Sequence, residues 1–165
     1  STCSHLMGIS QNQIVRTLKE FKGVEHRLEY VRTINEVEYI NDSKATNINS
    51  VIVAINTYDR PIILILGGFN KGANFRLLLP HIKSSHVREI VSYGDAGGQI
   101  NTALGDAVRS VQVTDLSSAV KKAQLMAAPG DIVLLSPGCA SYDEFSNFEE
   151  RGNHFKSMIK NIAIS

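Results

Sequence analysis

Apolar residues along the chain follow two spacings, one typical of helices and one typical of strands. After Ser10, which can cap a helix, four apolar residues fall on one helical face, and Gly23 ends the pattern. These residues are Ile14, Val15, Leu18 and Phe21. Two β-rich stretches follow at 27–34 and 36–41, with Asn35 near the turn. The pattern predicts a helix followed by a β-hairpin.

The rest of the chain alternates helical stripes with short apolar runs. Asn47 can cap a helix that buries Ile48, Val51, Ile52 and Ile55. Two further stripes contain Leu116, Ala119, Val120 and Ala123, capped by Thr114 or Asp115, and Phe155, Met158, Ile159 and Ile162. Strands are predicted at 61–66, 88–93, 108–113 and 131–135. We therefore expect an α/β, Rossmann-like fold, with a mostly parallel sheet flanked by helices and an N-terminal β-hairpin.

Length and composition indicate an ordinary globular protein. The 165 residues, 43% hydrophobic and 20% charged, suit a single domain over 1–165, in which we interpret residues 1–9 as the remnant of an interdomain linker. The net charge of +1 gives no broad surface for nucleic acid or an anionic membrane. No apolar run could span a bilayer and no signal peptide is apparent, so a cytoplasmic location is expected.

Few residues suggest a metal site or a nucleophile. The two cysteines, Cys3 and Cys139, form no CxxC pair, and the five histidines lack a metal-binding spacing. We expect no metal held by this chain alone. A buried, unreactive thiol is favoured over a nucleophile at Cys139.

Three loops follow predicted strands and should meet at one edge of the sheet, where open α/β sheets bind ligands. They span 42–47, 67–74 and 136–148. In the first, Asp42, Lys44 and Thr46 are two residues apart and would point the same way in an extended chain. A solvated turn that caps the next helix is the alternative.

The other two loops also allow two interpretations each. The segment Gly67–Gly72 is rich in glycine but lacks the spacing of a phosphate-binding P-loop, so Lys71 is either a charge for an anion or an exposed lysine in a tight turn. The third loop carries four acids before the last helix: Asp143, Glu144, Glu149 and Glu150. We expect them to complement the helix dipole and not to act as an acid–base pair.

Taken together, the three loops resemble the C-terminal domain of Mur ligases, and in particular the branch that adds D-glutamate. The resemblance rests on Asp-Ser-Lys-Ala-Thr-Asn at 42–47, Leu-Gly-Gly-Phe-Asn-Lys-Gly at 66–72, Leu-Ser-Pro-Gly-Cys-Ala-Ser-Tyr-Asp-Glu-Phe at 135–145 and Asn-Phe-Glu-Glu-Arg-Gly at 147–152. Order and spacing agree from about residue 8 to the end. Four positions depart from the family pattern: Asn70, where the family usually has Asp, Asn74, where another acid is common, and Gly138 and Tyr142, which are often Ala and Leu in the family.

The resemblance implies an ATP-dependent ligase of peptidoglycan precursor synthesis, which joins D-glutamate to UDP-N-acetylmuramoyl-L-alanine through an acyl phosphate. It implies D-glutamate contacts from Lys44, Thr46, Lys71, Ser141, Tyr142 and Phe148. It implies ATP contacts from His26, Arg27, Asp42 and Lys44. The P-loop, the Mg²⁺ ligands and most contacts to the UDP substrate are expected in upstream domains, so this segment should hold no catalytic residue and be inactive alone.

Two other functions remain open. One is a stand-alone Rossmann-like binding module without enzymatic activity. The other is a different Mur-type amino-acid ligase, such as a folylpolyglutamate synthetase.

Overall fold

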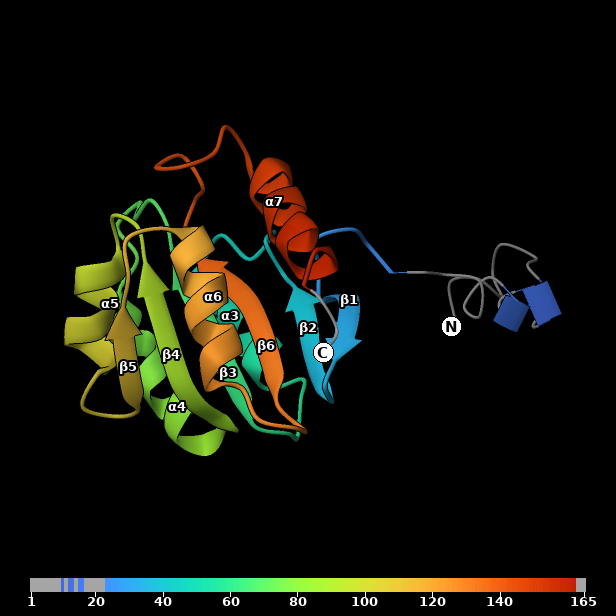
Figure 1. Cartoon of the computed structure of the whole chain (residues 1–165), viewed down its shortest axis with the longest axis horizontal. Helices are drawn as coiled ribbons and strands as arrows, with labels where there is room; N and C mark the ends of the chain where they lie inside the picture. Colours follow the sequence, from blue (N-terminus) through green and yellow to red (C-terminus); the bar gives the residue numbers. More distant parts are fainter. Residues whose placement is uncertain (1–9, 11, 14, 17–22, 163–165) are drawn as a thin grey trace.

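The central feature of the molecule is a six-stranded sheet in the order β1-β2-β6-β3-β4-β5 (Figure 1). The computed structural model describes residues 10, 12–13, 15–16 and 23–162. The strands are β1 (Glu29–Ile34), β2 (Val37–Asn41), β3 (Ile62–Gly67), β4 (Val87–Tyr93), β5 (Arg109–Gln112) and β6 (Ile132–Gly138). Only β1 runs antiparallel to its neighbour. The predicted mostly parallel α/β sheet is confirmed.

Helices cover both faces of this sheet. They are α3 (Ile48–Ile55), the 3₁₀ turn η1 (Phe75–Leu78), α4 (Leu79–Ser84), α5 (Gly97–Leu104), α6 (Leu116–Met126) and α7 (Phe148–Lys160). Apolar side chains of α3, α4 and α5 form one core with alternate residues of β3, and α6 and α7 form the other core with the remaining residues. Every residue of β3 is buried, as expected for a strand covered on both faces.

The hairpin forms because its turn residues accept a left-handed backbone. Asn35 and Glu36 have φ values of 49° and 62°, the signature of a two-residue turn whose twist matches the strands. Strand β1 begins two residues later than predicted, because His26 and Leu28 also have positive φ, at 62° and 44°. A left-handed backbone cannot continue a strand.

Short polar side chains fix where three helices begin. The side chains of Asn47, Asp115 and Asn147 accept from the amides of Ser50, Ser118 and Glu150 at 3.0, 2.7 and 2.7 Å. Asp115, and not Thr114, is therefore the cap of α6. The last helix ends at Lys160, so the predicted position of Ile162 on its apolar face is wrong, although Ile162 still packs against the core from beyond the helix.

Only part of the first predicted helix can be compared with the structure. Ser10 caps helical residues 12–13, since its hydroxyl accepts from the Gln13 amide at 3.3 Å. Val15 is helical, as predicted, and 45% exposed. Ile14, Leu18 and Phe21, and the linker proposed at 1–9, lie outside the described residues.

Candidate functional site

The three predicted loops meet at the carboxyl edge of the parallel strands. Asp42 N donates to Leu135 O at 2.8 Å, and Gly138 N donates to Ala45 O at 2.8 Å, which joins the first loop to the third. Phe69 and Ala140 exchange two backbone hydrogen bonds of 2.9 and 3.1 Å, which joins the second to the third. The loops therefore form one connected edge.

Gly67 is needed at this edge for packing between strands. A Cβ at this position would fall on the backbone oxygen of Tyr93 in β4, and the φ of 153° disfavours any other residue. The glycine thus serves the close approach of β3 and β4.

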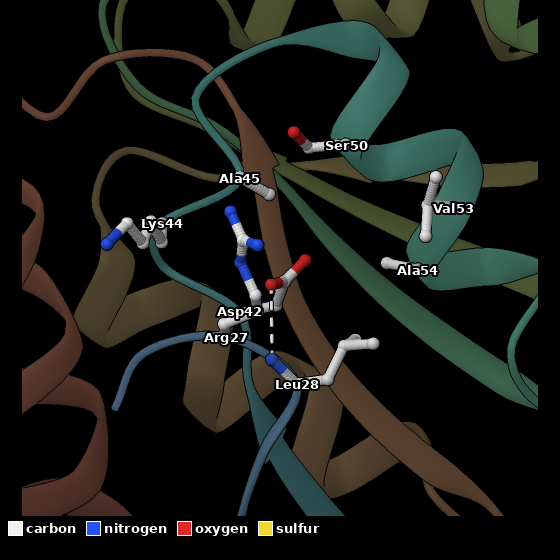
Figure 2. A pocket seen from close by; sticks show the side chains of 8 residues that line it. All are labelled: Arg27, Leu28, Asp42, Lys44, Ala45, Ser50, Val53 and Ala54. Atoms are coloured by element: carbon white, nitrogen blue, oxygen red, sulfur yellow. Dashed lines mark hydrogen bonds between the residues drawn. The ribbon is translucent and has the colours of Figure 1, made fainter. Parts of the chain in front are cut away.

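A first groove, of about 200 Å³, lies beside the first loop (Figure 2). Its lining residues are Arg27, Leu28, Asp42, Lys44, Ala45, Ser50, Val53 and Ala54. Figure 2 shows the Arg27 guanidinium pointing into the groove, opposite the wall formed by the α3 residues Ser50, Val53 and Ala54. The groove combines an apolar wall with a cation, an acid and a hydroxyl. Such a lining suits a flat heteroaromatic group that carries polar substituents.

Asp42 is the buried acid of this groove. Its Oδ1 accepts from Leu28 N at 3.2 Å and its Oδ2 accepts from Ser136 Oγ at 2.8 Å, and the residue is 5% exposed. Burial raises the pKa of the carboxyl to about 6, against the opposing effect of these two hydrogen bonds. The acid is therefore poised to change its charge near neutral pH.

The predicted alignment of Asp42, Lys44 and Thr46 on one side of an extended segment is wrong. The chain turns here, since Ala45 N donates to Asp42 O at 2.9 Å and Thr46 N donates to Lys44 O at 2.9 Å. Asp42 is buried, while the Lys44 ammonium points away from the groove (Figure 2) and lies 5.3 Å from the centre of the Phe148 ring. The alternative, a turn that caps the next helix through Asn47, is confirmed, but the turn is not solvated, because Asp42 and Ser43 are buried.

His26, the fourth predicted ATP contact, does not line the groove. It is 3% exposed, its Nδ1 lies 3.0 Å from Asn41 Nδ2, and its ring meets the edge of Phe148 with 6.0 Å between ring centres. Burial lowers the pKa of the imidazole, which favours the neutral form. His26 instead packs between Asn41, Phe148 and the backbone of α7 at Gly152, outside the groove.

A second groove, of about 510 Å³, lies on the other side of the first loop. It contains two of the predicted D-glutamate contacts, Thr46 and Lys71, together with the amino end of α3 at Asn47. A hydroxyl, an ammonium and a helix N-terminus all favour a bound anion. The loop that carries Lys71 is held by Asn70, whose Oδ1 accepts from the amides of Gly72 and Ala73 at 2.9 and 2.7 Å.

The remaining predicted contacts lie around the third loop. Ser141 is 2% exposed and Tyr142 is 65% exposed, so Ser141 is buried in the protein while its neighbour Tyr142 lies at the surface. Phe148 begins α7 and faces Lys44. None of Ser141, Tyr142 and Phe148 lines the second groove.

Cys139 and the loop acids have structural roles. Cys139 is 1% exposed, and burial raises the pKa of its thiol to about 12, which confirms the unreactive interpretation. Glu144 accepts from Leu116 N at 3.1 Å at the start of α6, and Glu150 accepts from Ser146 N at 2.9 Å at the start of α7. Glu149 and Glu150 lie in the first turn of α7, as predicted, whereas Glu144 complements the start of α6 and Asp143 accepts from Asp95 N.

Arg151 was missed by the sequence reasoning. It is completely buried, and its guanidinium donates to oxygens of Ser43, Cys139 and Ala140. A signal for its burial was present, because Arg151 lies four residues before Phe155 and thus on the apolar stripe of α7. A cation in the first turn of a helix, where the dipole disfavours it, was a second signal.

Neither a metal-binding cluster nor a membrane-spanning helix is present in the described part of the chain. No group of three or more His, Cys, Asp or Glu side chains there could hold a metal ion. No helix there is long and apolar enough to cross a membrane.

Comparison with protein families gives a match over residues 26–139 to the model described as "Mur ligase, glutamate ligase domain". The UDP-N-acetylmuramoylalanine–D-glutamate ligase of Clostridioides difficile is 45% identical over 161 residues, which are 96% of this chain and 36% of that protein. The enzyme of the same name from Chloroherpeton thalassium is 42% identical over 94% of this chain and 33% of its own length. The chain thus spans about a third of the curated relatives it matches.

Solved structures share the fold at low sequence identity. UDP-N-acetylmuramate–alanine ligase from Thermotoga maritima matches with a TM-score of 0.69 and 14% identity, over 96% of this chain and 35% of that one. A bifunctional folylpolyglutamate synthase/dihydrofolate synthase from Yersinia pestis matches with a TM-score of 0.67 and 18% identity, over 92% and 35%. At these identities the likeness concerns the fold alone.

Proposed function

The chain belongs to the Mur ligase family, as its glutamate ligase domain, and we propose that it forms part of an ATP-dependent ligase that adds D-glutamate to UDP-N-acetylmuramoyl-L-alanine. The relatives that are 42% and 45% identical carry this activity in their names. The reaction belongs to peptidoglycan precursor synthesis, and a cytoplasmic location is part of this proposal. In this proposal the domain supplies the D-glutamate site and part of the ATP site.

The observation that carries this proposal is the pair of grooves on either side of the segment 42–47. The first groove has the apolar wall and polar rim suited to a nucleotide, and the second has the cation and helix N-terminus suited to a carboxylate. One short segment contributes Asp42 and Lys44 to the first groove and Thr46 to the second. This arrangement would hold two substrates at a fixed separation.

In the proposed reaction, the γ-phosphoryl group of ATP passes to the substrate carboxylate, giving ADP and an acyl phosphate. The amine of D-glutamate then attacks the acyl carbon, the C–O bond to phosphate breaks, and the amine loses a proton. The role of this domain is to hold the amine in position, which can accelerate a reaction greatly without an acid–base residue. Magnesium and the phosphate-binding loop would come from the remainder of the full-length protein.

Within this scheme the predicted residues have separate roles. Arg27, Asp42 and the stem of Lys44 border the nucleotide groove, and Asp42 offers a carboxylate to the ribose. Thr46 and Lys71 pair one carboxylate of D-glutamate. Ser141, Tyr142 and Phe148 would meet the amino acid from the third loop, and His26 would hold the segment that carries Arg27 from outside the groove.

Steady-state kinetics of the full-length protein test this division. We expect Lys71→Ala to raise the KM for D-glutamate by at least about tenfold, since a charge-assisted hydrogen bond is lost, and to leave the KM for ATP within about twofold. Asp42→Ala should instead raise the KM for ATP. Lys83→Ala, an exposed lysine change in α4, is the matched control. An unchanged KM for D-glutamate in Lys71→Ala would remove Lys71 from the site.

The choice of amino acid separates the proposal from its closest rival. A folylpolyglutamate synthetase would use L-glutamate with a folate, whereas the proposed enzyme requires D-glutamate. Turnover with L-glutamate and not with D-glutamate would overturn the assignment. A full-length protein that binds nucleotide but forms no amide with either would favour a binding module.

A further inference from the structure

Arg151 is a buried cation whose hydrogen-bond partners are all neutral oxygens. Its Nε donates to Ser43 Oγ at 3.0 Å, and its two terminal nitrogens donate to the carbonyl oxygens of Ser43, Cys139 and Ala140 at 2.9, 3.1 and 3.0 Å. Among the ion pairs of the described residues, none involves Arg151. A buried charge held this way is costly, and a purely packing role would be served equally by an apolar side chain.

The partners of Arg151 belong to two different loops. Ser43 lies in the turn that borders the nucleotide groove, between Asp42 and Lys44. Cys139 lines the second groove, and Ala140 precedes Ser141 and pairs with Phe69 of the second loop. A planar guanidinium with donors at fixed angles therefore sets the distance between these loops.

Ser43 extends the contact toward the nucleotide side. It is completely buried, its hydroxyl donates to Phe148 O at 2.8 Å, and its amide donates to Asn41 Oδ1 at 3.1 Å. The Asn41 amide nitrogen in turn lies 3.0 Å from His26 Nδ1 and donates to Glu29 Oε2 at 2.9 Å. A continuous chain of hydrogen bonds thus runs from the third loop to the segment that carries Arg27.

The backbone of α7 also contacts the segment that carries Arg27. A Cβ at Gly152 would fall on the His26 ring, so the backbone of α7 packs directly against His26, the neighbour of Arg27. Helix α7 is thus in contact with both sides of the edge, through Arg151 toward the third loop and through Gly152 toward His26. Neither Arg151 nor Ser43 lines a groove.

We propose that Arg151 and Ser43 are positioning residues that hold the amino-acid loops and the nucleotide turn as one unit. This inference rests on the proposed function and adds two residues to it. The pair sets where Lys71, Thr46 and Ser141 stand relative to Asp42, and therefore where the attacking amine stands relative to the nucleotide. Small errors of placement lower the rate even when both substrates still bind.

A double-mutant cycle in the full-length protein tests the pair. Ser43→Ala removes the acceptor of Arg151 Nε, and Arg151→Lys keeps the charge but cannot span three carbonyl groups. We expect each to lower kcat/KM for D-glutamate about 10- to 100-fold, with much of the loss in kcat. The kcat/KM of the double variant should be no lower than that of the less active single variant, because the two residues act as a unit. Ser84→Ala, an exposed serine in α4, should have no effect and should combine independently with Arg151→Lys.

Hydrogen–deuterium exchange of the same proteins separates positioning from general destabilisation. Peptides covering 42–46 and 136–146 should lose protection in both variants, while peptides covering β3 and β4 remain protected. Three outcomes would each overturn the proposal. They are independent effects of Ser43→Ala and Arg151→Lys on kcat/KM, unchanged turnover in the variants, and an equal loss of protection in β3 and β4. A wild-type protein that lacks ligase activity would contradict the proposed function alone, since the exchange pattern would still decide whether the pair joins the loops.

Discussion

The buried acid Asp42 gives the sharpest test of the electrostatics of the site, through the substitution Asp42→Asn. The side chain is 5% exposed and has two hydrogen-bond donors, Leu28 N and Ser136 Oγ, but no cation within ion-pair distance in the described structure. Burial therefore dominates and raises the pKa of the carboxyl from 3.8 to about 6. Asparagine has the same shape without the charge.

The raised pKa of Asp42 sets the size and the sign of its effect on stability at each pH. The folded protein prefers the neutral acid, so the stability contributed by the raised pKa is fully present below pH 3.8 and is lost as the pH rises through about 6. Above that pH, the lost free energy of unfolding approaches about 3 kcal/mol. This value is the difference between the two pKa values multiplied by about 1.4 kcal/mol for each unit. Asp42→Asn should thus leave stability nearly unchanged near pH 4 and raise it by up to about 3 kcal/mol near pH 7.5.

Urea unfolding of the 165-residue chain between pH 4 and pH 7.5, followed by circular dichroism, measures this difference. The exposed acid Asp106 provides the control, and Asp106→Asn should show little dependence on pH relative to the wild type. A difference between Asp42→Asn and wild type that stays constant with pH would refute the raised pKa. A difference that grows toward low pH would show that the hydrogen bonds outweigh burial.

Three further changes test the packing of the site. Gly67→Ala should destabilise the protein by at least about 3 kcal/mol in thermal or urea unfolding, because the new Cβ meets the backbone of β4 at a φ of 153°, and a normal melting curve would contradict this. Asn147→Ala should cost about 1 kcal/mol in urea unfolding, since it removes the cap of α7, whereas no loss would mean that packing alone fixes the start of the helix. In a Cys3→Ser background, the Cys139 thiol should react with Ellman's reagent far more slowly in the native than in the unfolded protein, because it is buried and its pKa is about 12. Equal rates would place it at the surface.

The interpretation of the second groove depends on Asn70 as well as on Lys71. Asn70 holds the loop through two backbone amides and donates to Gln99 Oε1 of α5 at 2.6 Å. Aspartate, which the family pattern favours here, would keep both backbone contacts, and Gln99 could turn its amide to donate. This departure from the pattern therefore preserves the position of Lys71.

The sequence alone determined the positions of the strands along the chain, their alternation with helices, and the meeting of three loops at one edge. These features depend on local rules. A run such as 62–66 is apolar throughout because both faces of β3 are covered, and Asn47 and Asn147 cap the helices that follow them through bonds spanning three residues. The positive φ values at Asn35 and Glu36 likewise suit the predicted hairpin turn.

Only the tertiary structure decided which way the side chains at that edge point. Asp42 is buried beside Ser136, which lies 94 residues away and donates to it, and Ser43 and Arg151 meet across 108 residues. Alternation along an extended segment predicted that Asp42 and Lys44 face the same way, but the hydrogen bond from Ala45 N to Asp42 O turns the chain between them. The direction of a polar side chain in a loop is set by partners that only folding brings near, since a polar group that is buried without a partner is costly.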